Sequence, residues 1–133
     1  MENLFSIENK VIIITGAGRG IGYQLAVGLA KHSAIIYSLD KKFAKKIPKN
    51  FSSNIIEIKC DITDYSKIKQ VFKKIFMKEK RIDVLINNAG VSFASQKKNQ
   101  AYSEKDWIQT IDVNLTGSFY CSQEVIKYML KQR

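Results

Sequence analysis

Four short aliphatic runs constrain the fold of this chain most strongly. They are separated by segments in which apolar residues recur at helical spacing. Short continuous aliphatic runs are typical of strands that are buried on both faces of a parallel sheet. The runs are 11–14, 34–39, 55–58 and 82–86. Strands alternating with helices predict an α/β fold, in which right-handed crossovers place helices on both faces of a doubly wound parallel sheet.

Two of the connecting segments are predicted to be amphipathic helices. After the first strand, one helix face gathers Ile21, Leu25, Gly28 and Leu29. After the third strand, Asp64 is a candidate N-cap, because a carboxylate accepts hydrogen bonds from the free amides of a first turn. The apolar stripe of this second helix follows the i, i+3, i+4, i+7, i+8 pattern. It consists of Ile68, Val71, Phe72, Ile75 and Phe76.

The segment from Ser103 onward is predicted to be helical, as two helices that meet near Asn114, with Ser103 serving the first turn. Trp107 is expected to be a packing anchor. The final part carries apolar residues on two sides, and the sheet can cover only one of them. One side holds Leu115, Phe119, Ile126, Met129 and Leu130, and the other holds Tyr120, Val125 and Tyr128.

Composition excludes several classes of protein. The 133 residues are 45% hydrophobic and 26% charged, which predicts a single globular domain over residues 1–133. No apolar run reaches the ~18 residues of a membrane helix, and the first ten residues lack the pattern of a secretory signal. We therefore expect a cytoplasmic protein that binds no membrane. The net charge of +10 permits anionic partners, but no nucleic-acid-binding motif accompanies it.

Cysteine and histidine are too few for several kinds of site. Cys60 and Cys121 lie far apart in the sequence and form neither a disulfide framework nor a metal site, so reduced thiols are the simplest interpretation. His32 is the single histidine and is expected at a helix end on the surface. No metal site is predicted.

The candidate binding residues are expected at the strand ends, because ligands of such sheets bind beyond the carboxyl ends of the strands. The first strand runs into T-G-A-G-R-G-I-G at 15–22, and a helix follows. Glycines permit a tight turn there, and they let phosphates approach bare amides at the positive end of the helix. Ile21 replaces the last glycine of G-x-G-x-x-G, so the spacing fits T-G-x-x-x-G-x-G. The turn predicts a site for a dinucleotide's pyrophosphate.

The second strand ends at Asp40. An acidic residue at this place accepts hydrogen bonds from the adenosine ribose and repels a 2′-phosphate, which favours NAD over NADP. Lys41 and Lys42 follow directly, and either of them can attract a 2′-phosphate. The alternative interpretation is that Asp40 simply ends a strand.

Polar side chains also follow the other two strands. Asp61, after the third, either accepts from an adenine amino group or serves as a turn or cap residue, while Cys60 is interpreted as a buried apolar side chain. The fourth strand ends at N-N-A-G, 87–90, where amides can satisfy backbone groups and small residues leave room for a flat ligand. Taken alone, this tetrapeptide is equally an Asx turn.

Four motifs, in their order and spacing, resemble the short-chain dehydrogenase/reductase family over essentially the whole chain. They are Thr15-Gly16-x-x-x-Gly20-x-Gly22, Asp61, the tetrapeptide at 87–90 and the hexapeptide D-V-N-L-T-G at 112–117. The resemblance implies a Rossmann-type domain that binds a nicotinamide dinucleotide. It also implies that this chain is the N-terminal, cofactor-binding portion, with an incomplete sheet made of the first four strands and their flanking helices.

The resemblance assigns the residues around the cofactor. The pyrophosphate would be lined by Gly16, Arg19, Gly20, Ile21 and Gly22. Asp40 would hold the adenosine ribose, and Asp61 with Ile62 the adenine. Asn88, Ala89 and Gly90 would border the cofactor, Asn87 would hold the strand ends together, and Val113 would back the pocket.

Asn114 corresponds to the asparagine of the family's catalytic tetrad, which shapes its helix and holds a water in a proton relay. The alternative is a helix kink or cap without a catalytic part. In the family, a serine and a Tyr-x-x-x-Lys follow that helix, and the 133 residues stop before them. Two other matches to this spacing, Tyr37 to Lys41 and Tyr65 to Lys69, precede Asn114 and are interpreted as decoys.

Two functions remain open. The first is an NAD(P)-dependent oxidoreductase that moves a hydride between the nicotinamide and an alcohol/carbonyl substrate. The second is a non-catalytic dinucleotide-binding or partner-binding fragment, which the missing Tyr-x-x-x-Lys favours. The fourth strand is expected to have an open apolar edge. Together with the two-sided final helix, this edge predicts either a homo-oligomer or a C-terminal half that covers both surfaces.

Overall fold

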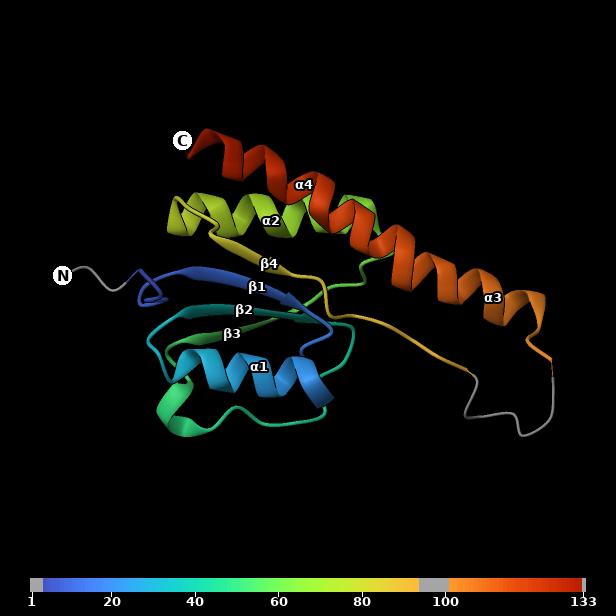
Figure 1. The fold of residues 1–133 in the computed structure, drawn as a ribbon, viewed down its shortest axis with the longest axis horizontal. Helices are drawn as coiled ribbons and strands as arrows, with labels where there is room; N and C mark the ends of the chain where they lie inside the picture. Colours follow the sequence, from blue (N-terminus) through green and yellow to red (C-terminus); the bar gives the residue numbers. More distant parts are fainter. Residues whose placement is uncertain (1–3, 94–100, 133) are drawn as a thin grey trace.

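A computed structural model describes residues 4–93 and 101–132. Its centre is a four-stranded parallel sheet with the order β3-β2-β1-β4, in which every predicted strand is present. The strands are β1 (Val11–Thr15), β2 (Ile35–Asp40), β3 (Ile55–Lys59) and β4 (Val84–Ile86). Helix α1 (Gly20–Ala30) covers one face, and α2 (Tyr65–Glu79) and α4 (Ser118–Lys131) cover the other (Figure 1). The predicted Rossmann-type, doubly wound α/β fold is therefore confirmed.

Each face of the sheet buries its own apolar cluster, because successive strand side chains point to opposite faces. Ile13 packs toward α2 and α4, whereas Ile12 and Ile14 pack toward α1. The predicted stripe of α2 is confirmed, since its buried residues are Ile68, Val71, Phe72 and Ile75. Asp64 caps this helix by accepting a hydrogen bond from the Lys67 amide at 2.9 Å, as predicted.

Helix α1 is fully buried only through small residues, while Leu25 and Leu29 of the predicted apolar face pack partly buried against the same cluster. Its buried residues are Gly22, Ala26 and Ala30, while Ile21 is 75% exposed. A Cβ on Gly22 would lie 2.4 Å from the carbonyl oxygen of Gly16. The helix therefore lies so close to the preceding turn that no larger side chain fits between them.

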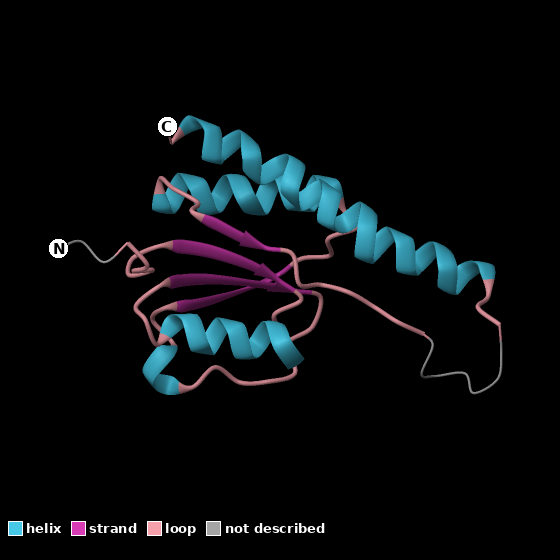
Figure 2. Cartoon of the chain, viewed as in Figure 1, coloured by secondary structure: helices cyan, strands magenta, loops and turns pink. Residues whose placement is uncertain are grey.

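The last helical segment follows one path through α3 (Glu104–Ile111), the π-helical segment η2 (Asp112–Gly117) and α4. Figure 2 shows α3 extending past the carboxyl ends of the strands, while α4 lies along α2. The predicted junction near Asn114 is this π-helical segment, and Ser103 caps α3 by accepting from the Asp106 amide at 3.1 Å. The expectation that Trp107 anchors packing is wrong, because 60% of it is exposed.

The two apolar sides of α4 are confirmed except at Met129, which was predicted on the outer side but packs partly buried against the core. Val125 and Tyr128 are buried against the core, whereas the opposite side of the helical path is more than half exposed. That side, the apolar stripe of α4, consists of Leu115, Phe119, Ile126 and Leu130.

The connection after β2 is irregular, while His32 and the two cysteines lie as expected. Residues 41–48 form neither helix nor strand, and a short 3₁₀ turn, η1 (Lys49–Phe51), leads to β3. His32 is exposed just after α1, and Cys60 and Cys121 are buried free thiols. The first ten residues are predicted to lack a secretory signal, and residues 1–3 of this stretch lie outside the described residues. Within residues 4–93 and 101–132, no helix has the length and apolar character needed to cross a membrane.

A carboxylate ties the amino ends of β1 and β4 together. Asp83 Oδ2 accepts from the Val11 amide at 2.8 Å and from Arg81 Nε at 2.8 Å, and Lys10 Nζ lies 3.9 Å from Oδ1. Burial acts to raise the pKa of Asp83, but the hydrogen bonds from Arg81 and Val11 and the charges of Arg81 and Lys10 outweigh it and lower this pKa. The ionised form therefore stabilises the fold.

We predict that Asp83→Asn lowers the free energy of unfolding by about 1–2 kcal/mol near neutral pH, because one buried hydrogen-bonding oxygen and a charge are lost. Since the folded pKa is depressed, this contribution is present above pH of about 4 and disappears as pH falls through the folded-state pKa. Urea unfolding of both chains at about pH 7 and about pH 3 measures the difference. If the difference in free energy of unfolding between wild type and Asp83→Asn is the same at both pH values, the assignment is contradicted. Glu8→Gln is the control.

Candidate functional site

One cleft of about 630 Å³ lies at the carboxyl ends of the strands, where the strand order reverses between β1 and β4. Such a reversal is where ligands bind in open α/β sheets. All the predicted site residues line the cleft except Gly22, Asn87 and Asn114. The lining also includes Ala44, Val91 and Gln109, which the sequence analysis missed. Gln109 precedes Val113 by one helical turn, so helical spacing from Val113 would have found it.

The glycine-rich turn is open toward this cleft. Gly16 and Gly20 have φ of 65° and 57°, the left-handed region that glycine adopts without strain. A Cβ on Gly20 would meet no atom within 4 Å, and Arg19 and Ile21 beside it are exposed. The turn and the first residues of α1 therefore present bare backbone amides at the positive end of the helix. These features fit a pyrophosphate group.

Asn88 fastens this turn to the end of β4. Its Nδ2 donates to the carbonyl oxygens of Thr15 and Gly16, both at 3.0 Å. Thr15 Oγ1 in turn accepts from the amides of Asn88 and Ala89 at 3.1 Å. The resemblance assigned the task of holding the strand ends to Asn87, and this is corrected. Successive side chains leave a strand on opposite sides, so Asn87 donates instead to Ser122 Oγ of α4, at 2.9 Å.

Asp40 holds the loop that follows β2 against the glycine turn. Its Oδ2 accepts from the Gly18 amide at 2.8 Å and its Oδ1 from the Lys42 amide at 3.2 Å. A Cβ on Gly18 would lie 2.1 Å from the Lys42 carbonyl oxygen, so only glycine permits this approach. Each carboxylate oxygen can accept a second hydrogen bond. Asp40 can therefore hold the loop and still accept from a ligand in the cleft.

Asp61 divides its two oxygens between a turn and an ion pair. Oδ1 accepts from the Thr63 amide at 3.0 Å and from Thr63 Oγ1 at 2.8 Å, so the interpretation as a turn residue is correct. Oδ2 lies 3.1 Å from Lys41 Nζ. Burial acts to raise the pKa of Asp61, but the hydrogen bonds from Thr63 and the charge of Lys41 lower it overall. Asp61 is therefore an anion at neutral pH.

The π-helical segment is held against the end of β3. A Cβ on Gly117 would lie 2.6 Å from Ile62 Cδ1, so glycine is needed where η2 meets this buried isoleucine. This contact places Val113 and Gln109 along the wall of the cleft opposite the glycine turn.

Asn114 clamps the chain that leaves β4. Its Nδ2 donates to the Val91 carbonyl oxygen at 2.9 Å, and its Oδ1 accepts from the Val91 amide at 2.8 Å. The side-chain amide thus bonds to one residue at both ends. This geometry supports the structural interpretation of Asn114 and leaves its catalytic part a prediction.

Two tyrosines that match the Tyr-x-x-x-Lys spacing serve other purposes. The hydroxyl of Tyr37 donates to Glu79 Oε1 at 2.6 Å, and the hydroxyl of Tyr65 donates to Glu124 Oε2 at 3.2 Å. Neither tyrosine lines the cleft. Among the described residues, no group of three or more potential metal ligands comes together.

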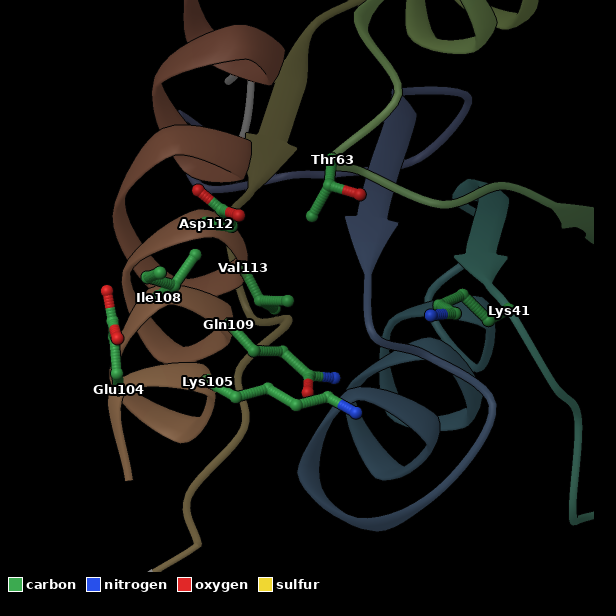
Figure 3. A pocket seen from close by; sticks show the side chains of 8 residues that line it. All are labelled: Lys41, Thr63, Glu104, Lys105, Ile108, Gln109, Asp112 and Val113. Atoms are coloured by element: carbon green, nitrogen blue, oxygen red, sulfur yellow. The ribbon is translucent and has the colours of Figure 1, made fainter. Parts of the chain in front are cut away.

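A second hollow of about 410 Å³ adjoins the cleft between α3 and the loop after β3. In Figure 3, Lys41 reaches into it from the end of β2, while Lys105 and Gln109 approach from α3. Lys41, Gln109 and Val113 line both spaces. Lys41 and Lys105 therefore approach, from opposite sides, the end of the predicted site near Asp40 and Asp61 where the adenosine is expected.

The sheet order, the open glycine turn and the cleft at the strand reversal define a Rossmann-type α/β protein. The family model described as short chain dehydrogenase matches residues 10–133. The chain therefore belongs to the short-chain dehydrogenase/reductase family of oxidoreductases.

Several relatives place this assignment in context. The chain is 35% identical over 136 residues to the 3-oxoacyl-(acyl-carrier-protein) reductase FabG of Thermotoga maritima, covering 96% of the chain and 53% of that protein. It is 31% identical to a 3beta-hydroxysteroid dehydrogenase of Mediterraneibacter gnavus, covering 92% and 46%. The ligand-free aldohexose dehydrogenase of Thermoplasma acidophilum matches with a TM-score of 0.77 and 33% identity, over 96% and 47%. The chain thus spans about half the length of the relatives it matches.

We predict that Asn88→Ala lowers the free energy of unfolding by about 2 kcal/mol, because two carbonyl oxygens at the turn lose their donor. The adjacent Asn87→Ala, which removes one exposed hydrogen bond, is the matched control and is expected to change stability by no more than about 0.5 kcal/mol. Urea unfolding monitored through Trp107 fluorescence or circular dichroism measures both. Equal losses in the two variants contradict the role given to Asn88.

Proposed function

We propose that the chain binds a nicotinamide dinucleotide, and that it forms the cofactor-binding part of an oxidoreductase acting on an alcohol/carbonyl pair. The observation that carries this proposal is the open turn at Gly20, whose bare amides face the cleft. NAD is preferred to NADP, because the Asp40 carboxylate lies at the end of β2 where the adenosine ribose is expected. Membership of an oxidoreductase family supports the reaction class.

The residues of the chain would bind and orient the cofactor. The pyrophosphate would be lined by Gly16, Arg19, Gly20, Ile21 and Gly22. Asp40 would hold the ribose hydroxyls, and Asp61 with Ile62 would hold the adenine. Ala89 and Gly90 would border the cofactor without filling the cleft, and Val113 would form its far wall. The dinucleotide, when bound, supplies the hydride acceptor or donor. Asn114 would contribute by positioning the chain after β4, since both ends of its amide bond to Val91.

We predict that Gly20→Val weakens NADH binding at least about tenfold, because a β-branched residue is strained at a φ of 57° and would project into the cleft. Fluorescence titration of NADH measures the dissociation constant. Gly28→Val is the matched control, because a Cβ on Gly28 also meets open space but lies on α1 away from the cleft. Equal affinity of wild type and Gly20→Val would disprove the phosphate site.

The second candidate is a non-catalytic dinucleotide-binding or partner-binding module. It is favoured by the bonding of Tyr37 and Tyr65 to Glu79 and Glu124, which leaves neither tyrosine at the cleft. Turnover of a panel of secondary alcohols with NAD separates the two candidates. Clear activity from residues 1–133 alone excludes the module, and binding of NADH without turnover supports it.

We also propose that further protein covers the apolar stripe of α4 and the edge of β4. Among the described strands β4 pairs only with β1, and its Val84 is 37% exposed. Exposed aliphatic strand edges and helix stripes are rare on monomers. A second copy of the chain is proposed to cover the stripe. Further strands are proposed to cover the edge, since the relatives are about twice as long as this chain. Buried free thiols support a cytoplasmic location.

We predict that Phe119→Lys combined with Leu130→Lys lowers self-association of the chain, because charges in the apolar stripe cannot be desolvated cheaply. Sedimentation equilibrium across a range of concentrations measures the dissociation constant of the dimer. Gln24→Lys, an exposed substitution on α1 at the other face of the sheet (Figure 1), is the control and should leave association unchanged. A wild-type chain that stays monomeric at all concentrations rules out the second copy.

A further inference from the structure

The ion pair between Lys41 and Asp61 joins the ends of two neighbouring strands across the cleft. Lys41 directly follows Asp40 at the end of β2, and Asp61 follows the end of β3. Lys41 Nζ lies 3.1 Å from Asp61 Oδ2, and both residues line the cleft. A lysine next to the ribose-binding position is where a positive charge would receive the 2′-phosphate of NADP. In this chain that charge is already compensated by a carboxylate.

We propose that Asp61 determines the preference between NAD and NADP by holding Lys41 away from the 2′-phosphate position. This inference rests on the proposed dinucleotide site. Lys41 is the cation that a 2′-phosphate would need, because Asp40 on the same loop repels that group. As long as Asp61 is ionised, a bound 2′-phosphate must draw Lys41 from its partner and then lies near two carboxylates.

The solvent exposure of the Lys41–Asp61 ion pair fits a role in selecting between NAD and NADP. The Lys41 side chain is 65% exposed and that of Asp61 37%, so solvent screens the attraction between them. The pair is therefore weak enough to be redirected by one change of charge. A bound 2′-phosphate would compete with Asp61 for the ammonium group of Lys41. Freeing Lys41 should consequently change the relative affinity for the two dinucleotides by a measurable factor.

The substitution Asp61→Asn removes the ion pair with Lys41 and can keep the hydrogen bonds of the turn. The two oxygens of Asp61 have different partners, with Oδ1 bonded to Thr63 and Oδ2 to Lys41. An asparagine can keep the Thr63 hydrogen bonds through its carbonyl oxygen and place its amide group toward Lys41. Any contact of Asp61 with the adenine is common to NAD and NADP. Its loss would change both affinities together and leave their ratio unaltered.

The neighbouring Lys42 supplies a matched control. It also lines the cleft and follows Lys41 in the chain, and among the described residues no carboxylate forms an ion pair with its side chain. Removing Lys42 therefore subtracts a similar charge from the same loop without touching the Lys41–Asp61 pair.

The experiment measures dissociation constants of NADH and NADPH at low ionic strength by fluorescence titration. The chains are wild type, Asp61→Asn, and Asp61→Asn combined with either Lys41→Met or Lys42→Met. We expect Asp61→Asn to shift the ratio toward NADPH by about tenfold, which corresponds to about 1.4 kcal/mol. The shift should disappear with Lys41→Met and persist with Lys42→Met. Circular dichroism melts verify that each variant is folded.

A second variant tests the inference without altering Asp61. In the wild-type background, Lys41→Met should change the ratio by less than about twofold, because the charge it removes is already compensated. A tenfold loss of NADPH affinity there would show that Lys41 is available to the phosphate and would overturn the inference.

The remaining outcomes are distinct. An unchanged ratio in folded Asp61→Asn overturns the inference while leaving the dinucleotide site intact. A shift that survives Lys41→Met also overturns it, because simple repulsion by Asp61 would then be the cause. Failure of the wild-type chain to bind either dinucleotide refutes the proposed function, and the inference with it.

Discussion

The cleft depends on the close approach of the β1–α1 turn to the end of β4. A Cβ on Gly16 would lie 2.6 Å from Ala89 Cα, and one on Gly22 would lie 2.4 Å from Asn88 Nδ2. The amide of Asn88 takes up the carbonyl oxygens of this turn, so its inward polar groups are paired. On its other side the turn lines the cleft at Gly16 and Gly20, and the space beside Gly20 is open. The glycines that let the turn approach β4 therefore also leave the cleft open to a ligand.

Both carboxylates of the adenosine end combine a structural and an electrostatic task. Asp40 holds the amides of Gly18 and Lys42, and Asp61 holds Thr63 together with the ammonium group of Lys41. Each loop is positioned by the same group that sets the charge facing a ligand. Under the proposed function, cofactor preference would therefore be coupled to loop geometry. A substitution that alters one would alter the other unless, as in Asp61→Asn, the two oxygens have separate partners.

The two edges of the sheet differ in character. On the β3 edge, Glu57 and Lys59 are exposed charged residues, which discourage pairing with another strand. On the β4 edge the strand consists of Val84, Leu85 and Ile86, all of them accessible in part. The apolar stripe of α4 adds a second uncovered surface on the same half of the molecule. This asymmetry supports the proposal that further protein covers the β4 edge and not the β3 edge.

The sequence by itself determined the four strands, the buried stripe of α2, the caps at Asp64 and Ser103 and the position of the glycine turn, because each depends on the spacing of near neighbours. Tertiary structure alone decided which face of α1 is buried, that Asn88 and not Asn87 joins the strand ends, and that Trp107 is exposed. It also decided that Lys41 meets Asp61, since this contact exists only where β2 and β3 become neighbours. Periodicity describes one element at a time, whereas these features depend on the distance between elements that are remote in the chain.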